Sequence, residues 1–394
     1  MKKECDLLVI GGGPAGSTIA ALAARRGASV LVIERASFPR DKVCGEFLSA
    51  EGCRVIERLG LLDELVSRGC VWTGACRITD SRGARLDAEL PDLGEFGRDG
   101  LGVSRELLDP LLLDNARRQG AAVMMRHDAH EPLVEDGRVR GFRVRAVGDV
   151  DSGTEVRARV VVAADGRRSI LARRLHPGTG DPTKSSDASW FGLKIHLEGD
   201  PARLGGRIEL HLFDGGYAGL GAVEGRRVNL CLLATVRTIR DCGGSPDRLL
   251  RERVMANEAV RQVIGDAPAC GRWHTVGPLN WGARRPEACG AFFVGDAAGT
   301  IDPFSGEGMS NAMRSAEIAV PHVMTAIDRG EADDECTRAY AEEWLRAFGP
   351  VTRRVRRVGR LFERPRLAAP VLRLLTGLGS AWVPRLIAST RTEG

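Results

Sequence analysis

A glycine-rich segment near the start of the chain is spaced to bind a dinucleotide. Gly11, Gly13 and Gly16 stand in the pattern G-x-G-x-x-G, directly after a short apolar run that predicts a buried strand. The first glycine permits a tight turn, the second lets the backbone approach a pyrophosphate, and the third lets the next helix pack closely on the strand. The start of that helix supplies N–H groups for the phosphates. Pro14 and Ala15, inside the motif, complete this candidate site.

An acidic residue follows at the distance that this motif requires. The segment after the glycines is rich in alanine and predicts a helix, and residues 28–34 predict a second buried strand that ends in Glu34. A carboxylate at this point can accept hydrogen bonds from a ribose hydroxyl pair. Strand, turn, helix, strand and acid together predict a dinucleotide site, with the neighbouring Arg35 as a further candidate.

Two later apolar runs end in polar turns. The first ends in Asp165 and Gly166, and the second ends in Gly295 and Asp296. Residues 302–309 follow and precede a predicted helix that extends to about residue 328. Taken singly, these segments could be strand-ending turns or helix caps, but their ordered succession favours a shared site.

The remaining elements predict an α/β chain. Short strands are expected near residues 121–126, 132–135, 139–147 and 155–163, after an entry loop and helix at 101–115. Residues 188–236 alternate between polar and apolar positions, as antiparallel strands do. A helix is expected at 247–264, and the chain looks helical from 331 onward.

Composition excludes several classes of protein. With 43% hydrophobic and 28% charged residues, the 394-residue chain is neither disordered nor fibrous, and it has no apolar run of transmembrane length. The ten cysteines form no C-x-x-C pair, so neither a zinc site nor a redox dithiol is predicted. Glu4 and Asp6 interrupt what would otherwise resemble a secretory segment, and the protein is therefore expected to be cytoplasmic, with reduced thiols.

The positive charge of the chain is concentrated at its end. Residues 351–394 hold ten arginines against two acids, whereas the rest of the chain is slightly acidic, which argues against a nucleic-acid binder. The arginines alternate with apolar residues, so this segment could lie as an amphipathic helix on an anionic membrane. We favour the alternative, a solvated helix packed on the dinucleotide domain.

Three motifs in this order resemble those of a known family. They are residues 11–16 with their acid, residues 164–169 (ADGRRS) and residues 294–309 (VGDAAGTIDPFSGEGM). The chain resembles the FAD-dependent oxidoreductases that include para-hydroxybenzoate hydroxylase, over about residues 5–325. The segments at 38–46 and 302–309 are most similar to the geranylgeranyl reductase branch, which borders the flavin-dependent halogenases.

The resemblance implies a Rossmann-like FAD-binding domain, a mixed sheet with ββα layers. It also implies an inserted, mostly antiparallel substrate domain and a helical C-terminus. NAD(P)H would bind transiently as electron donor, because the chain has no second glycine motif. The expected limits are 1–70, 101–178 and 270–330 for the FAD domain, 71–100 and 180–269 for the substrate domain, and 331–394 for the C-terminal region.

The resemblance also implies roles for individual residues. Asp296 would bind the ribityl chain of FAD, and Asp165 with Gly166 would lie near the pyrophosphate and ribityl. Arg105 matches an arginine that contacts the phosphate or ribityl, although it could be a surface ion pair. Ala129 is placed where a backbone group contacts the adenine.

A second group would lie at the flavin ring. Gly308 and Met309 would begin a helix that points at the N1–C2=O edge, where backbone N–H groups stabilise the reduced, anionic ring. Side chains would block this approach, which explains glycines at Gly306 and Gly308. Gly295 belongs to the same cofactor-binding set.

The branch suggests reduction of a carbon–carbon double bond in a hydrophobic, isoprenoid- or polyketide-like substrate. Cys44 matches a cysteine of the reductases and could donate the proton, although it could equally be a packed thiol. Glu46 lies in the same turn and could be a solvated charge. Tyr217 matches the tyrosine of a Tyr-x-Trp-x-Phe-Pro motif, but Gly219 and Gly221 replace the two aromatic residues. This loss should open the cavity beside the flavin.

Other reactions remain open. Hydroxylation or epoxidation through a C4a-hydroperoxyflavin is the main alternative, and Pro303 matches a proline near the reacting edge of the hydroxylases. Halogenation is disfavoured because no lysine occurs between Lys42 and Lys184 and because the Trp-x-Trp-x-Ile-Pro motif is absent. A non-enzymatic binding protein is least favoured, since all three motifs are intact.

Two histidines occupy polar positions of the alternating strands. His196 and His211 are each flanked by apolar residues, and either could face a substrate. We expect both to face solvent on the polar side of the sheet.

Overall fold

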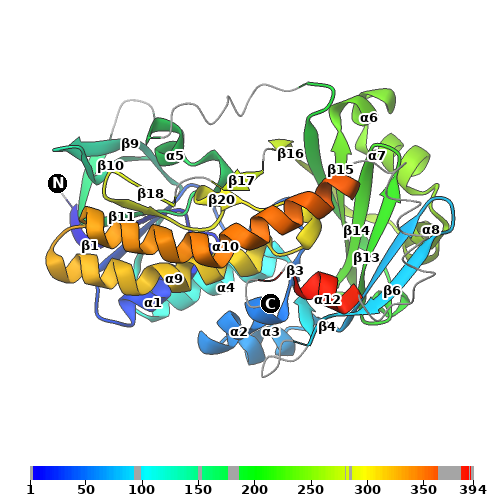
Figure 1. Cartoon of the computed structure of the whole chain (residues 1–394), viewed down its shortest axis with the longest axis horizontal. Helices are drawn as coiled ribbons and strands as arrows, with labels where there is room; N and C mark the ends of the chain where they lie inside the picture. Colours follow the sequence, from blue (N-terminus) through cyan, green and yellow to red (C-terminus); the bar gives the residue numbers. More distant parts are fainter. Residues whose placement is uncertain are drawn as a thin grey trace.

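The two predicted domains are built on two separate sheets that lie at opposite ends of the molecule (Figure 1). The computed structural model describes residues 3–92, 99–149, 153–175, 186–279, 281–283, 286–362, 383–389 and 391. An eight-stranded sheet carries the glycine motif, and a seven-stranded sheet forms the other end. The predicted α/β fold, with a mixed sheet, an antiparallel insertion and a helical C-terminus, is confirmed.

The eight-stranded sheet is parallel at its centre. Strand β1 (Lys3–Ile10) lies between β2 (Val30–Glu34) and β11 (Thr154–Ala163), and all three run in the same direction. Their apolar residues are almost fully buried, because helices cover the sheet. The other strands are β8 (Ala122–Met125), β9 (His127–Glu135), β10 (Arg138–Ala146), β18 (Glu287–Ala288) and β19 (Ala291–Phe293).

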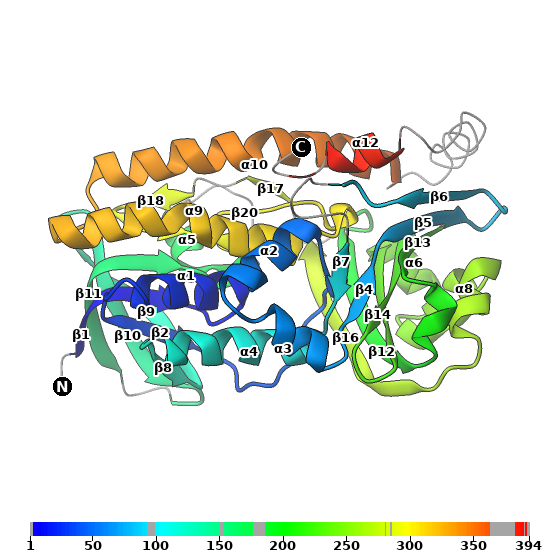
Figure 2. The ribbon, with the colours of Figure 1, turned by 90° about the horizontal axis from the view of Figure 1, so that it is seen from below.

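Four helices of this half lie side by side, as Figure 2 shows. They are α4 (Arg105–Arg118), α1 (Pro14–Ala24), α9 (Gly308–Arg329) and α10 (Asp334–Phe362). Helix α1 starts in the glycine motif with a proline in its first turn, where the missing N–H is not needed. Short elements between the main ones are α5 (Ile170–Leu175), β17 (Gly282–Ala283) and β20 (Gly299–Thr300).

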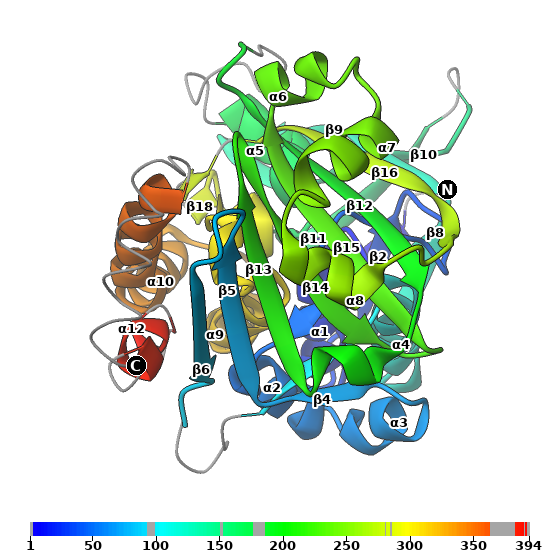
Figure 3. The same cartoon turned by 90° about the vertical axis from the view of Figure 1, so that its right-hand side faces the viewer.

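The seven-stranded sheet is antiparallel except for one pair, β5 and β13. Its order is β16 (Ala269–Leu279), β12 (Trp190–Glu198), β15 (Arg227–Thr235), β14 (Gly216–Val223), β13 (Arg207–Phe213), β5 (Ala75–Asp80) and β6 (Arg85–Glu89). Because β16 pairs with β12, this domain extends to residue 279, beyond the limit expected at 269. Helices α6 (Val236–Asp241), α7 (Pro246–Leu249) and α8 (Glu258–Ile264) cover its outer face (Figure 3).

The single helix expected at 247–264 is interrupted. A π-helical turn over Leu250–Val254 follows α7, and α8 begins only after Asn257. The Asn257 side chain accepts a hydrogen bond from the N–H of Ala259 at 3.0 Å, which caps α8 and ends the preceding turn.

A small three-stranded sheet connects the two halves. It contains β3 (Phe47–Leu48), β7 (Gly100–Gly102) and β4 (Val71–Thr73), with β7 in the middle. Helices α2 (Ala50–Arg58) and α3 (Leu62–Ser67) lie between β3 and β4 in the chain. The chain segments that connect the two halves are therefore hydrogen-bonded to one another through β7.

The C-terminal region packs on the rest of the protein. Helix α10 buries Tyr340, Trp344 and Phe348, and the Tyr340 hydroxyl donates to the carbonyl of Phe293 at 2.6 Å. The short helix α12 (Val383–Ala388) lies against β6, while residues 363–382 of the basic segment lie outside the described residues. No helix in the described ranges is long and apolar enough to cross a membrane.

The expectation that His196 and His211 face solvent is wrong. Both side chains are buried, because each face of the seven-stranded sheet is covered. His211 lies on the helix-covered face and contacts Thr79 through Nδ1 at 2.8 Å and Glu209 through Nε2 at 3.2 Å. His196 lies on the inner face, against the segment at residues 41–46. Alternation identified two faces correctly, but not what covers them.

Candidate functional site

A cavity of about 700 Å³ lies between the two halves, where the glycine turn meets the inner face of the seven-stranded sheet. Most of the predicted site residues line it. They are Gly13, Pro14, Ala15, Cys44, Glu46, Arg105, Gly166, Tyr217, Gly295, Asp296, Pro303, Gly306, Gly308 and Met309. Segments from the start, middle and end of the chain thus form one site.

Two glycines outside the lining support the glycine turn. Gly11 has a φ of +105°, and a Cβ there would lie 2.5 Å from the carbonyl oxygen of Ala164. A Cβ on Gly16 would lie 1.8 Å from the carbonyl oxygen of Gly11. Both positions require glycine for the backbone packing that the motif predicts.

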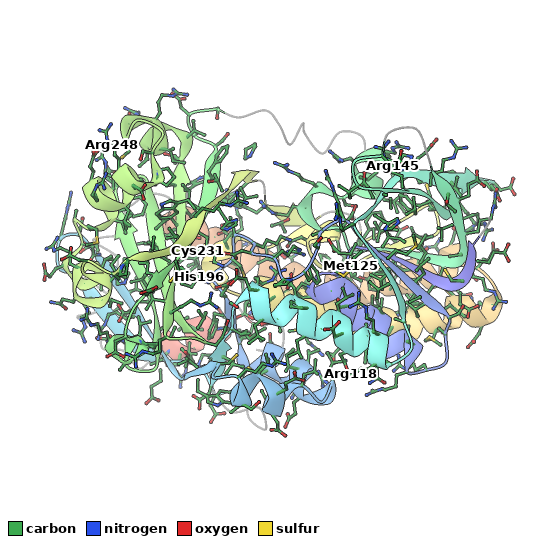
Figure 4. All side chains as sticks on the ribbon, turned by 180° about the vertical axis from the view of Figure 1, so that it is seen from behind. Arg118, Met125, Arg145, His196, Cys231 and Arg248 are labelled. Atoms are coloured by element: carbon green, nitrogen blue, oxygen red, sulfur yellow. The ribbon has the colours of Figure 1, made fainter. Side chains whose placement is uncertain are left out.

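Glu34, Arg35 and Ala129 also lie outside the cavity lining. The Glu34 carboxylate accepts hydrogen bonds from the N–H groups of Gly12 and Ala36, each at 2.7 Å, and so braces the glycine turn. Glu34 pairs with Met125, which Figure 4 labels, and Ala129 follows on the neighbouring β9. Arg35 is near the surface. Contacts of these three residues with the adenosine end of FAD remain predictions.

A group of arginines lies beside the glycine turn. Arg105 is buried and forms two hydrogen bonds with Asp109, from Nε at 2.6 Å and from Nη2 at 2.8 Å. Burial would lower the pKa of Arg105, but the Asp109 carboxylate raises it, so the cation is fixed. Arg40 also contacts Asp109, at 3.1 Å. A Cβ on Gly13 would lie within 4 Å of both guanidinium groups, at the position predicted for a pyrophosphate.

Lys42 adds a cation that the sequence analysis did not assign to the cofactor site. Its side chain lines the cavity and is accessible from it. Its Nζ would lie 3.8 Å from a Cβ on Gly166. Burial, and next the positive charge of Arg105, lower the pKa of Lys42 to about 8. The signal that could have found Arg40 and Lys42 was their position in the same segment as Cys44 and Glu46.

Two further carboxylates belong to this region: Asp296 lines the cavity, whereas Asp165 lies outside the lining, between the lining residues Ala164 and Gly166. Asp165 accepts the N–H of Ile170 at 2.9 Å through one oxygen, while the other oxygen is buried without a hydrogen-bond partner. Burial raises the pKa of Asp165. Asp296 lies 4.0 Å from Arg167. Cations, an unpaired acceptor and close backbone approach suit the phosphates and hydroxyls of a dinucleotide, so these residues fit FAD.

The segment at residues 41–46 joins the cofactor part to the sheet. Glu46 is buried, and its Oε1 accepts the N–H of Arg105 at 2.8 Å and the Lys194 ammonium at 2.6 Å. Its Oε2 lies 2.6 Å from His196 Nε2. Asn229 donates to the carbonyl of Cys44 at 3.0 Å. Cys44, which lines the cavity, therefore lies in a segment that is hydrogen-bonded to the FAD half and to the seven-stranded sheet.

The inner face of the sheet supplies an apolar wall. Tyr217 packs edge-on against Phe304, with ring centroids 6.3 Å apart, next to the predicted Pro303. A Cβ on Gly219 would meet nothing closer than 3.7 Å, and one on Gly221 nothing closer than 3.8 Å. Both positions therefore have room for a side chain, which agrees with an opened cavity.

The C-terminal region closes the cavity. Ile387 of α12 packs against the cluster that contains Phe47 and Leu86, and both Ile387 and Arg391 line the cavity. Arg391 forms an ion pair with Glu307, the residue before α9, and burial lowers its pKa to about 10. Sequence reasoning gave no sign that this end of the chain returns to the site.

The pKa of Lys42 predicts how FAD binding depends on pH. Its ordinary pKa of 10.5 is lowered to about 8, so the apoprotein loses this charge above pH 8. A bound pyrophosphate would raise the pKa again, and binding then takes up a proton. FAD affinity should therefore fall by up to about tenfold per pH unit above pH 8. Fluorescence titration of the apoprotein with FAD between about pH 7 and pH 9 measures this.

Two substitutions test whether Lys42 causes the effect. Lys42→Met should bind FAD more weakly and with little pH dependence in this range. Lys42→Arg should bind well throughout, because arginine does not titrate there. A pH dependence that persists unchanged in both variants would assign the effect to another group.

Comparisons with known proteins agree with this site. The family model for the FAD binding domain matches residues 4–355. A digeranylgeranylglycerophospholipid reductase of Methanoculleus marisnigri is 28% identical over 356 residues, which cover 87% of this chain and 82% of that protein.

Solved structures share the fold. The myxobacterial chondrochloren halogenase matches with a TM-score of 0.79 at 22% identity, over 100% of this chain and 94% of that one. A geranylgeranyl bacteriochlorophyll reductase-like protein from Thermoplasma acidophilum matches with a TM-score of 0.78 at 22% identity, over 99% and 96%. The resemblance found in the motifs is confirmed: the chain belongs to the FAD-binding-domain family and is an FAD-dependent oxidoreductase.

Proposed function

We propose that the protein uses NAD(P)H to reduce a carbon–carbon double bond of a hydrophobic, isoprenoid- or polyketide-like molecule. The observation that carries this proposal is a continuous cavity that extends from the glycine turn to an apolar sheet face. The relative from Methanoculleus marisnigri, named as a reductase of an isoprenoid lipid, supports the reaction and the substrate class.

Two side chains are placed to supply a proton. FAD, when bound, supplies two-electron hydride transfer, and the chain must supply the proton that completes reduction of the double bond. Cys44 and Tyr217 both line the cavity and carry a thiol and a hydroxyl. Glu46 fits this task less well, because its carboxylate is bound by Lys194 and His196. We assign Glu46 to positioning.

A monooxygenase is the second candidate. Room at Gly219 and Gly221 favours a bulky ring, and Pro303 lines the cavity where the family's hydroxylases have a proline. A halogenase is not favoured, although one shares the fold. Lys184, which entered that argument, lies outside the described residues.

Electron transfer separates the two candidates. FAD-loaded protein is reduced with NADPH or NADH without oxygen, then given air or a polyprenyl substrate such as geranylgeranyl phosphate. A reductase should return the flavin colour on adding substrate without oxygen, and the product should gain two hydrogens per reduced bond. Oxygen use that depends on substrate, with one oxygen atom added to the product, would instead establish the monooxygenase. If neither NADPH nor NADH bleaches the flavin, NAD(P)H is not the electron donor.

We further propose that the substrate carries an acidic group at one end. Arg357 of α10 lines the cavity, is exposed, and forms no hydrogen bond or ion pair with any described residue. Beside it, Trp281, Phe304 and Val358 belong to one apolar cluster. A cation next to an apolar wall suits a long apolar molecule that ends in a phosphate or carboxylate.

The preference for an acidic end can be measured with a matched pair of ligands. Geranylgeranyl phosphate should bind the FAD-loaded protein about tenfold more tightly than geranylgeraniol, as a charge-assisted hydrogen bond predicts. Arg357→Gln should remove most of this difference, whereas Arg360→Gln, outside the cavity lining, should retain it. Equal binding of the two ligands to the unmodified protein would contradict the proposal.

Helix α10, which carries the first arginines of the basic segment, packs on α9 as the favoured alternative expects. For the arginines after α10 we propose the other alternative, a peripheral membrane contact that would deliver a lipid-like substrate. Replacing Arg364, Arg366 and Arg373 with glutamine should weaken binding to anionic phosphatidylserine vesicles about a hundredfold, at about 1 kcal/mol per charge. Neutral phosphatidylcholine vesicles are the control. If flotation shows the same binding before and after the substitutions, the contact is not made by this segment.

A further inference from the structure

One buried cation, Lys194, has so far been described only as a partner of Glu46. Lys194 of β12 is fully buried, and it is not among the residues that line the cavity. A buried ammonium group is unfavourable unless other groups compensate its charge. Its partners therefore show what it does.

Both partners of Lys194 lie in the segment that contains Cys44. Its Nζ donates to Glu46 Oε1 at 2.6 Å and also to Asp41 Oδ1. Asp41 and Glu46 are the two ends of residues 41–46, and Cys44 lies between them. One ammonium group thus holds both ends of the segment.

Neighbouring side chains on the sheet hold the same segment. His196, two residues along β12, contacts the second oxygen of Glu46, and His274 of β16 lies 3.5 Å from Asp41. Asn229 of β15 binds the carbonyl of Cys44. Cys231 pairs with Lys194 in the sheet, and Figure 4 shows it beside His196 where the sheet meets the FAD half.

The backbone of the segment needs such support. Glu46 has a φ of +56°, a left-handed conformation that is unfavourable for a residue with a side chain. Such conformations persist when surrounding contacts determine them. Here those contacts are the bonds from Lys194, His196 and the N–H of Arg105 to the Glu46 carboxylate.

We propose that Lys194 is a positioning residue, which acts through Asp41 and Glu46 to hold Cys44 at the wall of the cavity. It touches neither the cavity nor the proposed substrate, so its effect on the reaction is indirect. The inference rests on the proposed function only for the use made of Cys44. The placement itself is testable without substrate or NAD(P)H.

The test measures the reactivity of Cys44 in the FAD-loaded protein. Iodoacetamide labelling is followed at each cysteine by peptide mass spectrometry, and the visible flavin spectrum is recorded. Lys194→Met should change the labelling rate of Cys44 at least about fivefold and shift the flavin spectrum, as expected for a displaced segment. Buried Cys53 and Cys242 should keep their rates. Lys194→Arg, which keeps the charge, should restore part of both signals.

Control variants distinguish positioning from general stability. His211→Asn disturbs a buried polar group on the opposite face of the same sheet and should leave Cys44 labelling and the flavin spectrum unchanged. Asp41→Asn removes one of the two carboxylates, and it should change Cys44 in the same direction as Lys194→Met but less. If Lys194→Met does not fold, the Asp41→Asn variant tests the inference in its place.

Two outcomes would overturn the inference. The first is unchanged Cys44 labelling and an unchanged flavin spectrum in the folded Lys194 and Asp41 variants. The second is an equal rise in labelling at all cysteines, which would show general loosening of the fold. Failure of the proposed reductase activity would leave both measurements interpretable, so the two ideas can fail separately.

Discussion

The architecture depends on how one buried carboxylate joins two sheets. Glu46 binds the backbone of Arg105 on the FAD side and the side chains of Lys194 and His196 on the sheet side. A carboxylate can be buried only when such partners compensate its charge, so these contacts, together with the small three-stranded sheet, hold the two halves to each other. The cavity lies beside this contact, and its walls come from both halves.

On the FAD side, the backbone and the charges serve different purposes. Glycines bring main-chain groups close together, as the short distance from Gly16 to the carbonyl of Gly11 shows. Arg40, Arg105 and Lys42 add positive charge around the space that this close packing leaves. Asp109 fixes two of these cations in advance, so little reorganisation is needed when an anionic cofactor binds. The segment that carries Lys42 continues along the cavity lining through Cys44 and Glu46.

At the sheet end of the cavity, the walls are mainly apolar, and residues from the end of the chain cover them. The sheet contributes Tyr217 and Gly219, which leaves room, while α10 contributes Arg357, α12 contributes Ile387, and Arg391 lies just after α12. In such a cavity, a ligand gains affinity by burying its apolar surface, and the few charged groups determine its orientation.

The sequence by itself determined the order of motifs, the parallel strands that carry them and the family to which the chain belongs. Those features are local, since a glycine turn and its acid lie within one strand–helix–strand unit. Most of the residues that it singled out for the site, including Cys44 and Tyr217, line the cavity. Only the tertiary structure decided that His196 is buried, that Lys194 binds Asp41 and Glu46, and that Arg391 returns to the cavity. Alternation along a strand separates two faces but does not tell what covers them, and ion pairs between residues about 150 positions apart leave no pattern in the local sequence.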